Sequence, residues 1–283
     1  MLGLATGVGI DIARKGGLEA WLMTPGLHDT TAPTYDARGR TVEVAGRAVY
    51  LDCRGVGSPT VVLETGFGGG ADGWGSLLDS LAAVTRSCAW DRPGIGRSAP
   101  RGRHSGGETA ADLRAALTAA GERGPYVVVA HSLGGIYARL FAATPGEPVA
   151  ELVMLDTYEP DLGMENDPAL DPAFRDVIRR ALDEGGALFE RAEDLDWQAT
   201  LADLRAADAK RPPTLLLYTD PYGRYQDPDQ EAKVAAWYRA IRARYPDGQL
   251  EIVQNTGHFI QFDRPDLVID RVREIVLRIR ATT

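Results

Sequence analysis

The sequence predicts an α/β domain with a largely parallel sheet and an inserted group of helices. Short runs rich in β-branched residues alternate with segments of helical apolar spacing through most of the 283 residues. One run, residues 126–130, is continuously apolar, which is typical of a strand buried on both faces. The alternation stops over residues 157–211, where only helical spacing is found. We therefore expect a helical cap inserted in an α/β core.

The expected elements can be placed in order along the chain. An antiparallel pair opens the sheet and turns at Ala45-Gly46-Arg47, and most later strands are short apolar runs. The expected strands cover residues 41–44, 48–53, 60–64, 87–90, 126–130, 151–156, 213–218 and 250–253. Apolar residues three and four apart predict core helices over residues 74–83 and 108–120, from the residues after Ser132 to about 144, and over 265–280.

The same spacing predicts two helices within the cap, one near Phe174 and one near Trp197. Residues 157–211 hold 14 acidic and 7 basic residues, a net charge of −7. Such a cap would repel anionic substrates if it covered a site, although most acidic runs are solvated faces. The expected organisation is an N-terminal segment of unknown role (1–40), a core (41–156 and 212–283) and the cap (157–211).

The charge and hydropathy patterns exclude two classes of protein. The formal net charge is −9 and basic residues do not cluster, which argues against nucleic-acid binding. The longest uncharged run, residues 124–138, is too short and too rich in glycine to span a bilayer. Residues 1–27 lack a basic segment followed by an apolar one, so no secretory signal is evident and a cytoplasmic location is expected.

The two cysteines, Cys53 and Cys88, do not have the spacing of metal ligands. They are predicted to be free thiols in a reducing compartment. We expect no metal site and no cofactor.

A strand, a serine between small residues and the start of a helix follow one another at residues 126–135. Ala130 lies two residues before Ser132 and Gly134 two after it, where larger side chains would collide with a sharp turn. This layout predicts a nucleophile elbow, in which the serine hydroxyl points away from the sheet. The alternative is a strand–helix junction whose buried serine caps the helix.

A serine hydroxyl needs a general base, and the base needs an orienting carboxylate. His258 follows the last predicted strand, at the sheet edge where ligand sites of α/β proteins gather. His131 precedes the serine directly and is expected to point elsewhere, into packing or a hydrogen bond. Asp156 and Asp220 end two successive strands, and both satisfy the chain order serine, acid, histidine. Either could instead cap a helix or turn.

The oxyanion of an acyl transfer needs two N–H donors. Leu133, next after the serine, is one candidate, and Phe67, in the glycine-rich residues 65–70, is the other. A phosphate-binding loop is the competing interpretation. No Lys-Ser/Thr follows these glycines and no GxGxxG is present, so nucleotides are set aside.

Four segments together resemble the α/β-hydrolase superfamily, specifically its capped serine hydrolases. They occur in the family's order and cover about residues 40–280; they are Val62-Leu63-Glu64-Thr65-Gly66-Phe67-Gly68-Gly69, Trp90-Asp91-Arg92-Pro93-Gly94-Ile95-Gly96-Arg97-Ser98, Ala130-His131-Ser132-Leu133-Gly134-Gly135 and Gly257-His258-Phe259-Ile260-Gln261. The resemblance implies an eight-stranded, mostly parallel sheet flanked by helices. Residues 1–40 match no part of it.

The resemblance also implies roles for individual residues. Ser132 becomes the nucleophile and His258 the base, with Phe67 and Leu133 as oxyanion donors. Most members carry the acid after a later strand, but haloalkane dehalogenases carry it where Asp156 stands, and Asp156 is favoured over Asp220. The segment beginning at Asp91 resembles the family's structural turn.

The family's strand order would also place Cys53 and Cys88 on neighbouring strands, but adjacent-strand disulfides are usually strained, so thiols are still expected.

The expected function is a serine hydrolase that cleaves carboxylic esters through a Ser-His-Asp triad. The expected substrate is a small, neutral, apolar ester. The alternatives are an aminopeptidase resembling proline iminopeptidases, a cofactor-free perhydrolase or haloperoxidase, and a ligand-binding protein of the same fold. Members with an aspartate nucleophile are excluded because residue 132 is serine.

Overall fold

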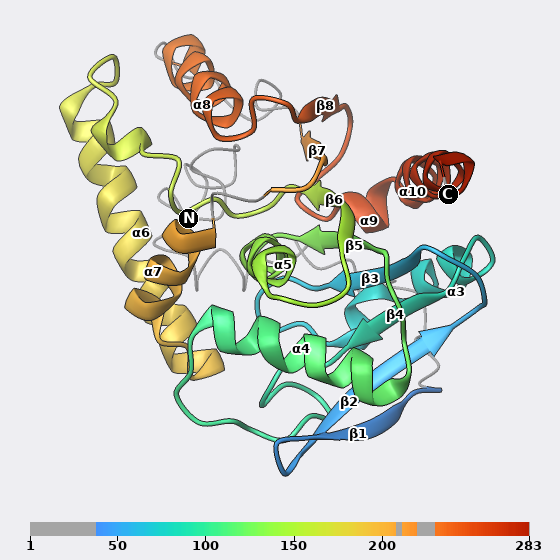
Figure 1. Cartoon of the computed structure of the whole chain (residues 1–283). Coiled ribbons are helices and arrows are strands. Elements are labelled where there is room, and N and C mark those ends of the chain that lie inside the picture. Colours follow the sequence, from blue (N-terminus) through green and yellow to red (C-terminus); the bar gives the residue numbers. More distant parts are fainter. Residues whose placement is uncertain (1–37, 208–210, 220–229, 283) are drawn as a thin grey trace.

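An eight-stranded sheet forms the centre of the protein (Figure 1). The computed structural model describes residues 38–207, 211–219 and 230–282. The strands are β1 (Arg40–Val44), β2 (Arg47–Arg54), β3 (Thr60–Glu64), β4 (Ser87–Trp90), β5 (Tyr126–His131), β6 (Val149–Leu155), β7 (Thr214–Thr219) and β8 (Gln249–Val253). Their order is β1-β2-β4-β3-β5-β6-β7-β8, and every pair from β4 to β8 is parallel. The predicted fold class is confirmed.

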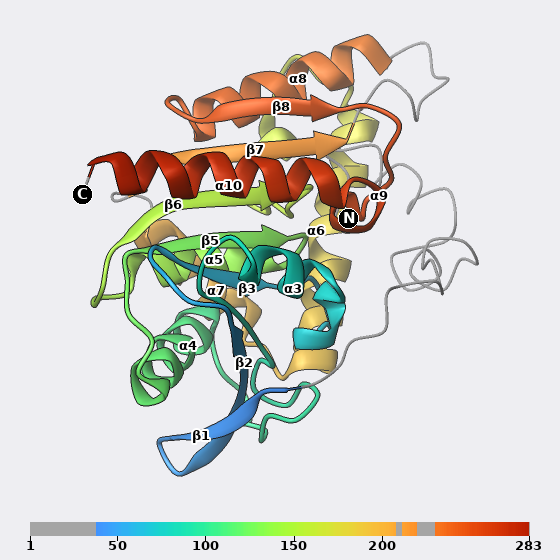
Figure 2. The same cartoon turned by 90° about the vertical axis from the view of Figure 1, so that its right-hand side faces the viewer.

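Helices cover both faces of the sheet. Figure 2 shows α3 and α10 in front of the strands, with α4 and α5 behind them. The helices of the core are η1 (Ala71–Trp74), α3 (Leu77–Ala82), α4 (Gly106–Ala120), α5 (Gly134–Ala143), α8 (Gln230–Arg244), α9 (Ile260–Asp263) and α10 (Pro265–Thr282). Each face has its own apolar cluster, because successive side chains of a strand point to opposite faces. On β5, Val127 and Val129 belong to the α3–α10 side, and Val128 and Ala130 to the α4–α5 side.

The helix predicted over residues 74–83 is interrupted in the structure. η1 ends at Trp74, and Gly75 has a φ of +49°, a conformation that glycine adopts without steric cost. The chain then enters α3 at Leu77. The prediction was wrong at this point because the apolar spacing continues across a glycine that changes the direction of the chain.

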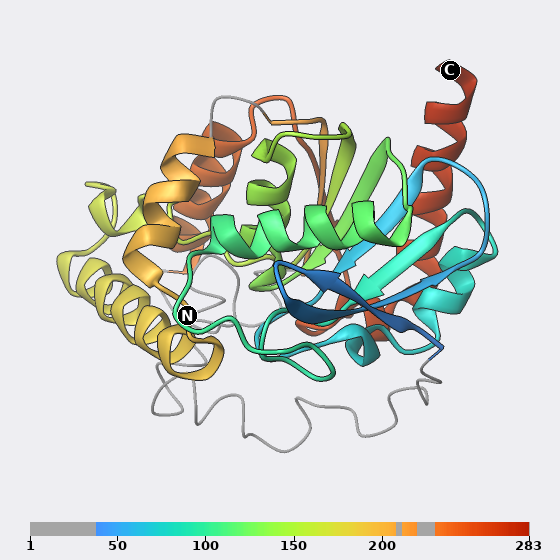
Figure 3. The same ribbon diagram turned by 60° about the horizontal axis from the view of Figure 1, so that its bottom comes forward.

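The segment between β6 and β7 is helical, as predicted, and we call residues 157–211 the helical insert. It contains η2 (Met164–Asn166), α6 (Pro172–Glu193) and α7 (Trp197–Ala207). The Asp171 side chain accepts from the backbone N–H groups of Ala173 and Phe174, which fixes the start of α6. Figure 3 shows α6 and α7 to one side of the sheet, and α7 packs against α4 and α5.

The prediction of free thiols is corrected by the structure. Cys53 on β2 and Cys88 on β4 form a disulfide. The two strands pair antiparallel, and the two residues are direct partners in the register, with Cα atoms 4.0 Å apart. The resemblance therefore placed the strands correctly, but the bridge removes the support that free thiols gave to a reducing compartment. Among the described helices, none combines the length and apolarity needed to cross a membrane.

Candidate active site

Ser132 occupies a strained turn at the carboxyl end of β5. Its φ is +56°, in the left-handed region that residues other than glycine rarely adopt. Three backbone hydrogen bonds hold this conformation: Ser132 N–H donates to the Leu155 carbonyl at 3.2 Å, and the N–H groups of Tyr158 and Gly135 donate to the Ser132 carbonyl at 2.9 and 3.1 Å. Strain that is held in this way is typical of functional residues.

Small residues are required around this turn. A Cβ atom added to Gly134 would lie 2.3 Å from the Glu64 carbonyl oxygen, a distance that real atoms do not reach. A Cβ atom on Gly66 would lie 3.0 Å from the Cβ of Ser132 and 3.3 Å from its Oγ. The loop after β3 therefore lies directly against the serine.

Asp156 and His258 meet in a short, buried hydrogen bond. His258 Nδ1 lies 2.7 Å from Asp156 Oδ2, and both side chains are almost fully buried. Asp156 also has a positive φ of 43°, and its N–H donates to the Leu217 carbonyl at 2.8 Å. Because an ionised carboxylate only accepts, His258 Nδ1 carries a proton in this pair, and Nε2 of the neutral ring is an acceptor.

The second acid considered from the sequence, Asp220, lies outside the described residues. Asp156 has further contacts with Thr219, whose N–H and hydroxyl lie 3.5 and 3.4 Å from Oδ1. These contacts are long for hydrogen bonds, so the bond to His258 dominates the surroundings of the carboxylate. Leu155, the residue before Asp156, and Tyr158, two residues after it, both form backbone hydrogen bonds with Ser132.

His131 supports the histidine loop. Its Nε2–H donates to the His258 carbonyl at 2.9 Å, and the two rings lie 4.6 Å apart. Burial, followed by electrostatic repulsion from His258, lowers the pKa of His131 well below its ordinary value. A neutral ring that donates to a carbonyl matches the expected hydrogen-bonding role, and it is a poor proton acceptor.

The two candidate oxyanion donors have N–H groups without an acceptor among the described residues. In the part of the chain that the structure describes, neither Phe67 N–H nor Leu133 N–H donates a hydrogen bond. Leu133 is fully buried at the start of α5, where an unpaired donor is costly unless a ligand accepts from it. The N-terminus of α5 adds a partial positive charge at the same place.

Asp91 has the supporting role that the resemblance implied. Its Oδ1 accepts from Ala71 N–H at 2.6 Å, and its Oδ2 accepts from Arg97 N–H at 2.8 Å. The carboxylate is fully buried and ties the turn after β4 to the start of η1. This turn carries Arg92 toward the glycine-rich loop.

Two residues for which the sequence predicted no role of their own contact this loop, Arg92 and Glu193. Arg92 is buried and forms ion pairs with Glu64 at 2.8 Å and with Glu193 at 2.9 Å. Burial raises the pKa of Glu64 to about 7, although Arg92 opposes this shift. Burial also acts to raise the pKa of Glu193, but the Arg92 charge and the hydrogen bonds to the carboxylate lower it overall. Glu193 lies 101 positions from Arg92, so local spacing carried no signal for it.

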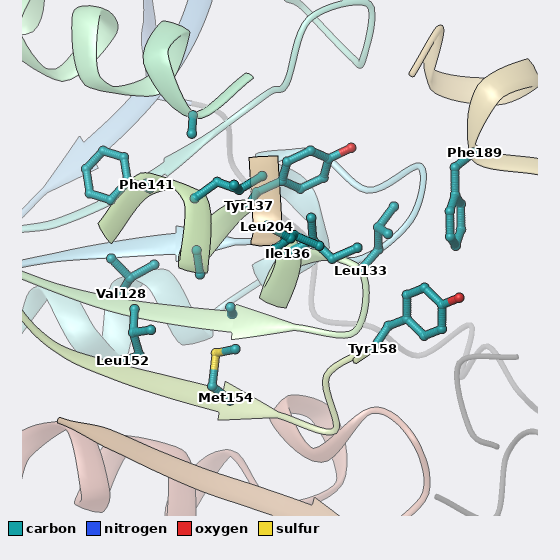
Figure 4. Close-up of a cluster of buried hydrophobic side chains, with 14 of the residues drawn as sticks. Val128, Leu133, Ile136, Tyr137, Phe141, Leu152, Met154, Tyr158, Phe189 and Leu204 are labelled. Atoms are coloured by element: carbon teal, nitrogen blue, oxygen red, sulfur yellow. The ribbon is translucent and has the colours of Figure 1, made fainter. Parts of the chain in front are cut away.

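Aromatic side chains join the helical insert to the site (Figure 4). The Phe189 ring of α6 lies 5.4 Å from the Phe67 ring and 5.7 Å from the Tyr158 ring. Trp197 of α7 packs on Phe189 with ring centres 5.4 Å apart. Phe189 and Trp197 are buried, as expected for packing between insert and core.

The family follows from a match to a sequence model. Residues 61–271 match the model described as the alpha/beta hydrolase family, so the chain belongs to that family. The match spans the three segments that carry Ser132, Asp156 and His258. Family membership supports a hydrolase as the coarse class of this protein.

Several individual proteins are similar to the chain. An uncharacterized Schizosaccharomyces pombe protein is 44% identical over 77 residues, which are 27% of this chain and 14% of that protein. The uncharacterized Bacillus subtilis protein YqjL is 29% identical over 119 residues, 41% of this chain and 47% of that protein. The chain thus spans less than half the length of these relatives. A thermophilic esterase from Thermogutta terrifontis shares the fold, with a TM-score of 0.55, 20% identity, and 86% and 99% of the two chains covered.

Proposed function

We propose that the protein is a serine hydrolase that cleaves carboxylic esters. The observation that carries the proposal is the buried 2.7 Å bond between His258 Nδ1 and Asp156 Oδ2 beside a serine at φ +56°. A carboxylate that fixes the imidazole tautomer leaves Nε2 as the proton acceptor that a serine nucleophile requires. In this proposal Asp156, rather than Asp220, is the third member of the triad.

The proposed reaction has two stages. His258 takes the Ser132 proton while Oγ attacks the ester carbonyl carbon, and the N–H groups of Phe67 and Leu133 bind the oxyanion. The tetrahedral intermediate expels the alcohol, which receives its proton from His258. Water, deprotonated by His258, then attacks the acyl-enzyme, and the carboxylic acid leaves as Ser132 regains its proton.

The acidic helical insert favours neutral over anionic esters in this proposal. It does not favour the aminopeptidase alternative. Its two buried glutamates, Glu159 and Glu193, are already paired with Arg139 and Arg92 at 2.9 Å each. A carboxylate engaged in this way is a poor partner for a substrate ammonium group.

The test combines labelling and turnover. Wild-type protein is treated with a fluorophosphonate, the adduct is mapped by mass spectrometry, and hydrolysis of p-nitrophenyl acetate and butyrate is measured. We expect one adduct, on Ser132, and turnover that Ser132→Ala lowers by at least about a thousandfold. Turnover that survives in Ser132→Ala contradicts the mechanism. Folded protein with neither adduct nor turnover favours a ligand-binding role.

A further inference from the structure

We infer that Glu193, the last residue of α6, is a positioning residue for the oxyanion loop, defined as residues 65–69. The inference rests on the proposed function and adds a part for the helical insert to it. Glu193 belongs to a different segment from every catalytic residue proposed above. Its carboxylate is 3% exposed and accepts four hydrogen bonds, one of them directly from the loop.

The direct contact fixes the middle of the loop. Gly68 N–H donates to Glu193 Oε1 at 2.8 Å. Gly68 has a φ of +64°, and the turn is closed by Gly69 N–H donating to the Gly66 carbonyl at 3.1 Å. Gly68 is the residue after Phe67, so the anchored peptide adjoins the candidate oxyanion donor. A charged acceptor makes this a strong hydrogen bond.

The indirect contact passes through Arg92. Its Nε and Nη2 donate to the two oxygens of Glu193, at 3.1 and 2.9 Å. The same guanidinium donates from Nη1 to the Thr65 carbonyl at 2.8 Å and from Nη2 to the Gly66 carbonyl at 2.7 Å. Arg92 therefore holds the two residues before Phe67, while Glu193 holds the residue after it. A planar guanidinium that is paired on one side can orient these carbonyls on the other.

Two further contacts make α6 a rigid support. The Tyr137 hydroxyl donates to Glu193 Oε2 at 3.0 Å, and the Phe189 ring, one helical turn before Glu193, packs on the Phe67 ring. Residues four apart lie on one face of a helix, so one face of α6 contacts the loop twice. Preorganised donors stabilise a developing oxyanion only if they stay in position during the reaction. The structure thus links the helical insert to transition-state binding.

The test compares Glu193→Gln with wild type. The amide keeps the size of the side chain but has only one acceptor oxygen, so it cannot accept from Gly68 N–H and from the Tyr137 hydroxyl, which now bond to different oxygens. We expect kcat for p-nitrophenyl butyrate to fall about 10- to 100-fold while KM stays within about threefold. The inhibition constant of an aryl trifluoromethyl ketone, which forms a tetrahedral adduct, should rise by a similar factor.

Glu122→Gln is the matched control. Glu122 is also buried and also receives Nε and Nη2 of an arginine, Arg86, but it precedes β5, at the opposite end of the strands from Ser132. The Glu122→Gln variant should have a lower free energy of unfolding than wild type and the same kcat. An unchanged kcat in Glu193→Gln, a change in KM alone, or an equal loss of kcat in Glu122→Gln would each overturn the inference.

A second readout separates this inference from the proposed function. Amide hydrogen exchange of the loop needs no turnover, and it should be faster in Glu193→Gln and unchanged there in Glu122→Gln. Equal exchange of the loop in wild type and Glu193→Gln refutes positioning, even if Ser132 proves catalytic. If Glu193→Gln does not fold, Tyr137→Phe decides: a lower kcat at constant KM supports the inference, and wild-type kinetics refute it.

Discussion

Replacing Asp156 by Asn tests the proposed triad most directly. The side chain keeps its shape, so the change is chemical: an amide that donates toward His258 Nδ1 selects the opposite tautomer of the ring. Nε2 then carries the proton and cannot accept one from Ser132. The bond that is altered is short and fully buried, at 2.7 Å, so water cannot substitute for the lost carboxylate.

The size of the effect follows from two contributions. A carboxylate about 4 Å from an imidazolium charge stabilises it by about 4 kcal/mol at an effective dielectric constant of about 20. The wrong tautomer adds about 1.4 kcal/mol if the reactive form is a tenth of the population. Together they predict a fall in kcat of about 10⁴-fold, the size seen when a triad aspartate becomes asparagine.

The assay is the hydrolysis of p-nitrophenyl butyrate, with melting temperatures recorded to confirm folding. Asp220→Asn is the comparison, because the sequence left both acids open, and we expect it to stay within about threefold of wild type. The reasoning is refuted if Asp156→Asn keeps more than about a tenth of the wild-type kcat, or if Asp220→Asn loses more activity than Asp156→Asn.

Three further predictions concern the surroundings of the site. Burial holds the pKa of His131 well below its ordinary value in the folded protein, whereas the unfolded chain takes up this proton below about pH 6.5, so stability should fall as pH drops below that value. The free energy of unfolding is measured by chemical denaturation at pH 7.5 and pH 5. Its decrease between these pH values should be smaller in His131→Gln than in wild type, by up to about 1.4 kcal/mol per pH unit. Equal decreases in the two proteins would contradict the lowered pKa of His131. Gly66→Ala should lower kcat for p-nitrophenyl butyrate about 10- to 100-fold, because the added methyl group would press on Ser132. A wild-type kcat in this variant would contradict the prediction. Thiol titration of the denatured, unreduced protein should find no free Cys53 or Cys88, whereas two free thiols would contradict the bridge.

The order of strands and helices could be predicted from the sequence because apolar spacing is a local property. Strands 60–64 and 87–90 were placed to the residue. Helix α8 was missed, although Val234, Trp237 and Ile241 have helical spacing and are buried on one face. The break at Gly75 was missed as well, because many glycines can adopt a positive φ and the sequence does not show which of them do.

The turn at Ser132 and the position of His258 after the last strand could also be predicted from the sequence, because each residue lies in a short motif whose neighbours are constrained by the same turn. The partner of His258 could not be predicted, since Asp156 and Asp220 both follow strands and only the folded chain brings Asp156 within 2.7 Å of His258. The disulfide depended on register, which places Cys53 opposite Cys88 across two antiparallel strands.

The Arg92–Glu193 pair joins residues 101 positions apart, so nothing in either local segment marks it. Local interactions and backbone sterics therefore set the helices and strands and the turn at Ser132. The partners of the buried charges were decided by packing between distant segments, where a charge is stable only beside its counterpart.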